Sequence, residues 1–144
     1  LDALHSNHKE CIKLMSSISE EKAKYRYADN KWSIKELIAH IIDSERIFAY
    51  RALRFARNDN TDLAGYDENH YGIFCAADER LLADLLYEFD VTRQSSIALF
   101  RSFDAEMLKR SGTANKMLID VKSLAYLIAG HCRHHINILR ERYL

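Results

Sequence analysis

The sequence lacks proline altogether and contains only four glycines in 144 residues. Proline breaks helices and glycine weakens them, so a chain with so few of either can be helical over almost its whole length. Strand-like alternation of useful length, internal repeats and a domain linker are also missing. These absences predict an all-α protein with a single domain over residues 1–144.

Cysteine, net charge and long apolar runs are scarce as well. Cys11, Cys75 and Cys132 are odd in number and have no CxxC spacing, which indicates a reducing compartment and no disulfide framework. Basic and acidic residues number 21 each, so no net field attracts nucleic acid or an anionic membrane. No apolar run approaches the ~20 residues of a membrane span, and no signal peptide is visible. We therefore expect a cytoplasmic protein with a small-molecule substrate and no nucleic-acid or membrane partner.

Apolar residues at three- and four-residue steps predict four long helices and a short one. The second helix has the clearest start, because Ser33 and Glu36 form a capping box flanked by Trp32 and Leu37. We expect long helices over residues 1–17, 34–56, 77–103 and 121–143, and a short helix over 105–110 that Asp104 caps and Gly112 closes. Residues 57–76 are expected to form a long polar connection, a feature that is often functional. The economical architecture is a four-helix bundle with an additional short helix.

Histidines carry the strongest functional signal. His131 and His135 stand one turn apart on the last predicted helix, on a face that is apolar as far as Ile128. A buried polar group without a partner costs about 1–3 kcal/mol, and a metal ion would serve both imidazoles. His40 lies in the middle of the second predicted helix, and bundles build metal sites from facing helices. We interpret His40, His131 and His135 as ligands of a divalent metal. The alternative is three unlinked histidines, two of them half exposed.

Three imidazoles leave a tetrahedral zinc ion one open position, as in catalytic sites, where a bound water has its pKa lowered to about 7. Imidazole also suits nickel, iron and copper, so the ligand set does not identify the metal. We favour zinc or nickel over iron or manganese.

Other polar residues are weaker candidates for the site, namely His5, His8, His70 and His134. His134 lies about 100° around the helix from His135, and we expect it to be a surface or supporting residue. His70 could cap the site from the polar connection. Only one of Asp43 and Glu45, at best, could orient a ligand imidazole, and Glu45 is expected to form ordinary salt bridges, as is Arg46. No carboxylate is clearly aimed at the site.

Two motifs frame the chain. The first is KWSIKEL at 31–37 with His40 and DSER at 43–46, and the second is the closing AGH at 129–131 with His134, His135 and the final Tyr143-Leu144. Together they resemble the DinB/YfiT-like superfamily over nearly the whole chain. The resemblance implies a four-helix bundle of up-down-down-up type, often dimeric, with a divalent metal on three histidines. Carried over to this sequence, those histidines are His40, His131 and His135.

The resemblance also implies a class of reaction. Members with known activity are mostly metal-dependent thiol S-transferases that use bacillithiol or mycothiol, beside a thiol-dependent isomerase and proposed hydrolases. We expect a metal-dependent enzyme, with transfer of a low-molecular-weight thiol to a small electrophile favoured over hydrolysis because no carboxylate is aimed at the site. The alternative from another class is a metal- or ligand-binding bundle without catalysis.

A homodimer is expected from the resemblance and from the neutral charge balance, which gives little self-repulsion. The second helix also has a wide apolar arc, made of Ile38, Ile41, Ile42, Phe48, Ala49, Ala52 and Phe55. A dimer interface would cover that arc, unless neighbouring helices of the same chain do so.

Overall fold

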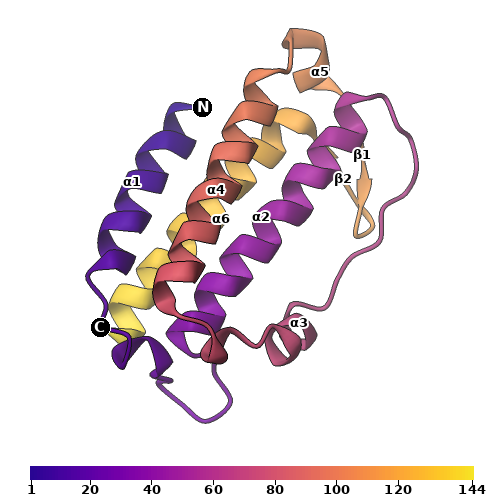
Figure 1. Cartoon of the computed structure of the whole chain (residues 1–144). Helices are drawn as coiled ribbons and strands as arrows, with labels where there is room; N and C mark the ends of the chain where they lie inside the picture. The colour runs from indigo at the N-terminus through magenta and orange to yellow at the C-terminus, as the bar shows by residue number, and fades with distance from the viewer.

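Four long helices dominate the computed structural model, which describes residues 1–144 (Figure 1). They are α1 (Asp2–Ser16), α2 (Ile34–Ala56), α4 (Leu82–Arg101) and α6 (Val121–Ile138), followed by a π-helical turn, Leu139–Tyr143. Shorter elements are α3 (Glu68–Phe74), α5 (Ala105–Lys109) and the 3-10 turns Lys22–Lys24 and Ala77–Glu79. The prediction of an all-α four-helix bundle with an additional short helix is confirmed. None of these helices combines the length and the hydropathy that a membrane span requires.

The bundle has the up-down-down-up connectivity that the family resemblance implied. In Figure 1, α2 and α4 run in the same direction, while α1 and α6 run in the opposite one. Both α1 and α2 pack against α4 and α6. Because α2 and α4 are parallel, the chain between them must return along the length of the bundle, which it does through residues 57–67 (Figure 1).

Local capping explains where several helices begin. The Ser33 hydroxyl accepts a hydrogen bond from the Glu36 backbone N–H at 3.1 Å, and the Glu36 carboxylate accepts one from the Ser33 N–H at 3.0 Å. This is the predicted capping box. The carboxylates of Asp104 and Asp120 cap α5 and α6 in the same manner. These starts are decided by residues within one turn, so the sequence predicts them well.

The beginning of α4 is different from the prediction. A 3-10 turn occupies 77–79, the chain is extended at Arg80, and the α-helix starts at Leu82. The Leu82 N–H donates to the carboxylate of Glu20 at 2.8 Å, so a residue from a distant segment caps this helix. Residues 57–76 also contain a helix that was not predicted. The Asp67 side chain starts α3 by accepting from two backbone N–H groups.

A β-hairpin stands where no strands were predicted. Strand β1 (Ser111–Ala114) pairs antiparallel with β2 (Met117–Asp120) through a two-residue turn. The turn residues, Asn115 and Lys116, have φ of 51° and 64°, the conformation for which Asn-Gly is the usual signal. Gly112 lies in β1 and does not close the short helix. Its backbone packs so closely on Phe55 that an added Cβ would lie 2.2 Å from the ring.

A buried polar layer divides the hydrophobic core into two clusters. The Arg93 guanidinium, which is fully buried, donates to both carboxylate oxygens of Glu45 at 2.8 and 2.9 Å. It also donates to the Leu4 carbonyl and the Asn7 side chain, and thereby joins α1, α2 and α4. The prediction of an ordinary salt bridge for Glu45 is therefore wrong, whereas Arg46 does pair with Glu88 near the surface.

The apolar arc of α2 lies mostly inside this core. Six of its members are at most 9% exposed: Ile38, Ile41, Ile42, Phe48, Ala52 and Phe55. Neighbouring elements of the same chain therefore cover the arc.

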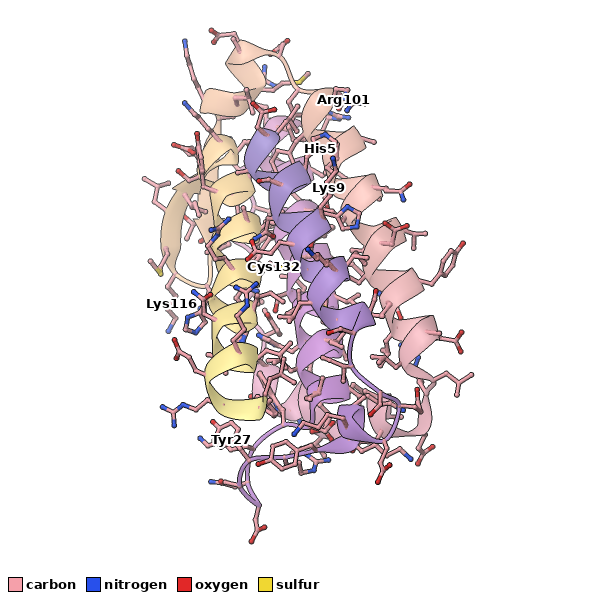
Figure 2. All side chains as sticks on the ribbon, turned by 90° about the vertical axis from the view of Figure 1, so that its left-hand side faces the viewer. His5, Lys9, Tyr27, Arg101, Lys116 and Cys132 are labelled. Atoms are coloured by element: carbon pink, nitrogen blue, oxygen red, sulfur yellow. The ribbon has the colours of Figure 1, made fainter.

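Two buried cysteines meet between α1 and α6. Cys132 of α6 faces α1 (Figure 2), and its Sγ atom lies 2.8 Å from the Sγ atom of Cys11; both are free thiols.

Candidate metal centre

The three predicted histidines meet at one point between α2 and α6. The Nε2 atom of His40 is 3.0 Å from that of His131 and 3.1 Å from that of His135. The third side of this triangle, between His131 and His135, is also 3.1 Å. His40 is 6% exposed and His135 is 9% exposed, while His131 is half-buried. We call these three side chains the histidine triad.

Aromatic rings hold the triad in place. The Trp32 ring lies against that of His40 with centroids 4.4 Å apart, and the Phe48 ring stands edge-on to that of His131 at 5.7 Å. Trp32 comes directly before the capping box, so the start of α2 also fixes this ring. The rings restrict the imidazoles to the orientation in which their Nε2 atoms converge.

Hydroxyl groups lie behind His40. The Ser44 hydroxyl is 3.5 Å from His40 Nδ1 and 2.6 Å from the hydroxyl of Tyr66. Neither Asp43 nor Glu45 has this position. Ser44 occupies it, and the carboxylate of Glu45 is bound to Arg93 instead. The residue that faces the far nitrogen of His40 is thus a serine, one turn along the same helix.

Burial keeps the triad uncharged. Burial, together with the smaller effect of a neighbouring histidine, lowers the pKa of His40 and of His131 to about 4; the neighbour is His131 for His40 and His134 for His131. Burial, followed by the charges of the adjacent histidines, lowers the pKa of His135 to about 3. Near neutral pH all three rings are therefore neutral, which is the form in which imidazole binds a metal.

The donor set fits a divalent metal ion. With bonds of about 2.0–2.1 Å and near-tetrahedral angles, three ligand nitrogens lie roughly 3.3 Å apart. The observed separations of 3.0–3.1 Å require only a small outward movement. Without a cation, three neutral rings cannot form hydrogen bonds along all three sides of this triangle, because each neutral Nε2 is either a donor or an acceptor and at least two of the three must be alike. These are the only histidine, cysteine or carboxylate side chains of the chain that cluster closely enough to hold a metal together.

A carboxylate that the sequence analysis missed lies beside the triad. One oxygen of Glu68, at the first residue of α3, is 3.9 Å from His40 Nε2. The Glu68 side chain is 55% exposed and is not part of the mutual cluster, so it borders the triad from the solvent side. The signal that could have revealed it is Asp67, a good helix cap, followed directly by a glutamate.

Close packing of α3 positions Glu68. Gly72 lies against Trp32, and an added Cβ there would be 2.5 Å from the indole nitrogen. Only glycine allows α3 to approach the ring that also supports His40. The position of α3, and with it that of Glu68, therefore depends on the Trp32 ring, which also lies against the triad.

The weaker histidine candidates lie outside the triad. His134 is exposed, as predicted, with its ring centroid 5.1 Å from that of His135. His70 is exposed and packs on Phe74, so it does not cap the site. His5 and His8 belong to α1, and His8 meets the Asp90 carboxylate at 2.8 Å.

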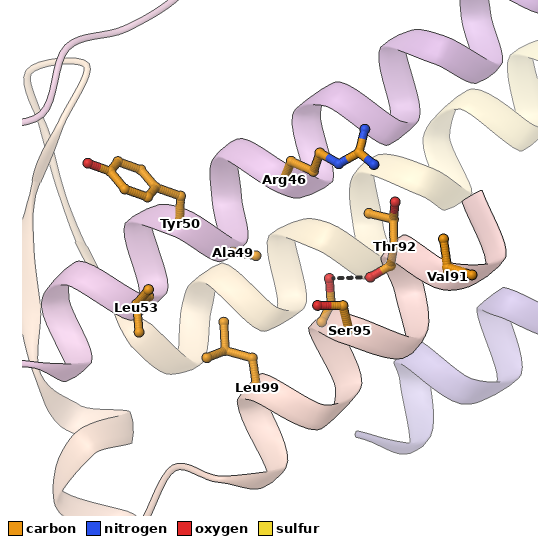
Figure 3. Close-up of a pocket in the computed structure, with 9 residues that line it drawn as sticks. Arg46, Ala49, Tyr50, Leu53, Val91, Thr92, Ser95 and Leu99 are labelled. Carbon is orange, nitrogen blue, oxygen red and sulfur yellow. Dashed lines mark hydrogen bonds between the residues drawn. The ribbon is translucent and has the colours of Figure 1, made fainter. Parts of the chain in front are cut away.

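Several cavities surround the bundle. One of about 530 Å³ lies between α2 and α4, and no histidine lines it (Figure 3). A smaller one of about 210 Å³ opens at the triad and is lined by His135 together with Trp32, Tyr27 and Tyr143. A third, of about 390 Å³, lies under the segment 61–66. An aromatic cavity therefore adjoins the triad at His135.

Comparisons with known proteins agree with the fold. The family model described as the DinB superfamily matches residues 3–139. A solved structure similar to this chain is that of YfiT from Bacillus subtilis, described as a probable metal-dependent hydrolase with an unusual four-helix bundle topology. The match has a TM-score of 0.86 at 18% identity and covers 97% of this chain and 81% of that one. No curated protein matches the sequence.

Proposed function

The chain belongs to the DinB superfamily, and from that premise we propose that it is a metal-dependent enzyme that acts on a small molecule. The observation that carries the proposal is the convergence of three neutral imidazole nitrogens within 3.1 Å of one another. His40, His131 and His135 would hold the metal, with zinc and nickel the favoured ions. When bound, such an ion supplies Lewis acidity at a position that the protein leaves free.

Glu68 would act as the proton acceptor. Its carboxylate lies 3.9 Å from His40 Nε2 and is open to solvent, so it can take a proton from a nucleophile that enters beside the triad. Thiol transfer was favoured from the sequence partly because no carboxylate was aimed at the site. With Glu68 in this position that reason no longer holds, and hydrolysis is the reaction that the arrangement supports best.

Thiol S-transfer remains the second candidate, and the aromatic cavity favours it. Tyr27, Trp32 and Tyr143 present rings on the approach to His135, and such a surface suits an apolar electrophile. A thiol would also have to lose a proton, and Glu68 could accept it. The low-molecular-weight thiol would then be a co-substrate.

Metal binding tests the ligand assignment. The substitutions His40→Ala, His131→Ala and His135→Ala should each lower zinc affinity strongly in a chelator competition assay. His134→Ala is the matched control and should leave the affinity close to that of the unaltered protein. Retention of zinc by the His40→Ala protein, or its loss on His134→Ala, would contradict the assignment.

Turnover separates the two reactions. The zinc- and nickel-loaded proteins are assayed with a series of nitrophenyl esters, and with chlorodinitrobenzene in the presence of several thiols. Glu68→Gln should reduce kcat by about 10²- to 10⁴-fold, the usual contribution of a general base. Glu79→Gln, at an exposed position on a nearby turn, is the control. Full activity of the Glu68→Gln enzyme would remove Glu68 from the mechanism, and no turnover in either series would favour a binding protein without catalysis.

A further inference from the structure

Arg51 differs from the other buried basic residues. Lys35, Arg51 and Arg93 are all at most 9% exposed. Lys35 pairs with the Glu20 carboxylate and Arg93 with that of Glu45. Arg51 has no carboxylate partner, and its single hydrogen bond is from Nη2 to the Ala64 carbonyl at 3.2 Å. A buried charge without a counter-charge is costly, and the chain itself provides no counter-charge for this guanidinium.

The side chain of Arg51 lines the cavity of about 390 Å³, which has the size of a small-molecule site. Arg54 and Asp62 line it too. Arg54 is occupied, because it is bound to Asp59 and to the hydroxyl of Tyr50. Arg51 is therefore the one cationic group lining this cavity that forms no ion pair.

The cavity lies near the histidine triad, and the contacts of Phe48 and Tyr66 relate the two. The Phe48 ring centroid is 5.7 Å from that of His131 and 6.0 Å from the Arg51 guanidinium carbon, so Phe48 lies between the two. Tyr66 lines the cavity and its hydroxyl bonds to Ser44, next to His40. His40, Ser44, Phe48 and Arg51 also follow one another at three- and four-residue steps on α2, along a single face.

We propose that Arg51 is the specificity residue of this site and binds the carboxylate of a small substrate whose reacting group lies at the triad. The proposal rests on the proposed function in one respect, namely that the reacting group is placed at His40, His131 and His135. A planar guanidinium binds a carboxylate through two parallel hydrogen bonds. One cation without an ion pair, in a cavity that Asp62 also lines, matches a singly charged carboxylate better than a doubly charged phosphate ester.

A purely structural role for Arg51 predicts different behaviour. In that case the guanidinium would only fix the segment around Ala64, and its removal would weaken folding without any preference for an anionic ligand. The experiment must therefore compare ligands that differ only in their charge.

Mercaptoalkanoic acids, from mercaptopropionate to mercaptooctanoate, provide such ligands, with the mercaptoalkanols of equal length as neutral counterparts. Their binding to the cobalt-loaded protein is followed by the thiolate-to-cobalt absorption band. For the chain length that spans the site, the acid should bind about ten- to a hundredfold more tightly than the alcohol, the range expected for hydrogen bonds to a charged group. Arg51→Gln should abolish this preference and Arg51→Lys should retain part of it. Arg54→Gln, the matched control, should leave it unchanged.

Two results would overturn the proposal: equal binding of acid and alcohol at every length, or a preference that persists in the Arg51→Gln protein. A second measurement does not depend on the metal or on a variant. In the metal-free protein, propionate should shift the NMR signal of the Arg51 Nε–H group, whereas propanol should not. If cobalt fails to bind but propionate gives this shift, the proposed function fails and the carboxylate site stands. If cobalt and thiols bind without a preference for acids and propionate gives no shift, the carboxylate site fails and the proposed function stands.

Discussion

Glu45 and Arg93 form a fully desolvated ion pair in the middle of the bundle, 2.8 and 2.9 Å apart at its two contacts. In the sequence Glu45 stands next to Arg46 and follows Asp43 and Ser44, a pattern typical of a solvated helix face. Its burial follows from a partner 48 positions away on α4. The pair gives each charge its counter-charge, so the loss of either partner strands the other.

The substitution Glu45→Ala should therefore destabilise the protein by about 3–5 kcal/mol, because Arg93 would remain buried and unpaired. Glu88→Ala is the control, since it removes only pairs with Arg46 and Arg80 nearer the surface and should cost about 1 kcal/mol or less. Urea unfolding measures both. Equal losses of stability in the two variants would contradict the inference that Glu45 is important because its ion pair with Arg93 is buried. Replacing Glu45 and Arg93 together by methionine should recover most of the stability.

Acid should release the metal at a lower pH than free imidazole would suggest. Protons and metal compete for the same Nε2 atoms, and an unperturbed histidine has a pKa of about 6.5. Burial, with the neighbouring histidines, lowers the pKa values of the triad in the metal-free chain to about 4 for His40 and His131 and to about 3 for His135. Proton competition therefore begins only as the pH falls toward these values.

Zinc occupancy, measured by elemental analysis after dialysis, should stay constant from pH 8 to about pH 5 and fall through about pH 4. Release centred near pH 6.5 would mean that the rings are more accessible than the structure indicates.

The lowered pKa values of the triad also affect the stability of the metal-free protein. Its unfolded chain binds protons at these histidines below about pH 6.5 while the folded chain does not, so its free energy of unfolding should decrease from there toward pH 4.

At the scale of elements, the hairpin turn contains a residue in a backbone conformation that its side chain disfavours. Lys116 has a φ of 64°, in the left-handed region that costs a residue with a Cβ about 1–2 kcal/mol. The substitution Lys116→Gly should therefore stabilise the protein by roughly 1 kcal/mol. Thermal unfolding shows whether the substitution raises or lowers the stability of the protein. Lys9→Gly, at an exposed position within α1, should instead destabilise by about 1 kcal/mol, and a loss of stability in both variants would contradict the assigned turn.

At the scale of the whole molecule, a homodimer remains our proposal, but through a different surface. Six of the seven residues of the apolar arc of α2 are covered within one chain. A groove between α2 and α4 is open, and Ala49, Leu53, Val91 and Leu99 line its cavity of about 530 Å³ (Figure 3). A second copy of the chain suits this groove, because 21 basic and 21 acidic residues leave no net charge to keep two copies apart.

Light scattering at micromolar concentration should give twice the chain's 16.8 kDa. The substitution Leu53→Glu places a charge in the groove and should shift the mass toward that of the monomer. Lys122→Glu, at an exposed position on α6, is the control and should leave the mass unchanged. A monomer mass for the unaltered protein would rule out this assembly at that concentration.

The sequence determined whatever depends on neighbours within a turn or two. The caps Ser33, Asp104 and Asp120 begin their helices, and the four-residue spacing of His131 and His135 puts both on one face, because helical periodicity is a local property. Bundle geometry then made it reasonable to place His40 opposite them. The tertiary structure alone decided which distant residues meet: Glu20 caps α4, Glu68 borders the triad, Arg93 neutralises Glu45, and the hairpin packs on Phe55. Such contacts depend on how rigid elements pack over the whole chain, and no pattern within one element encodes them.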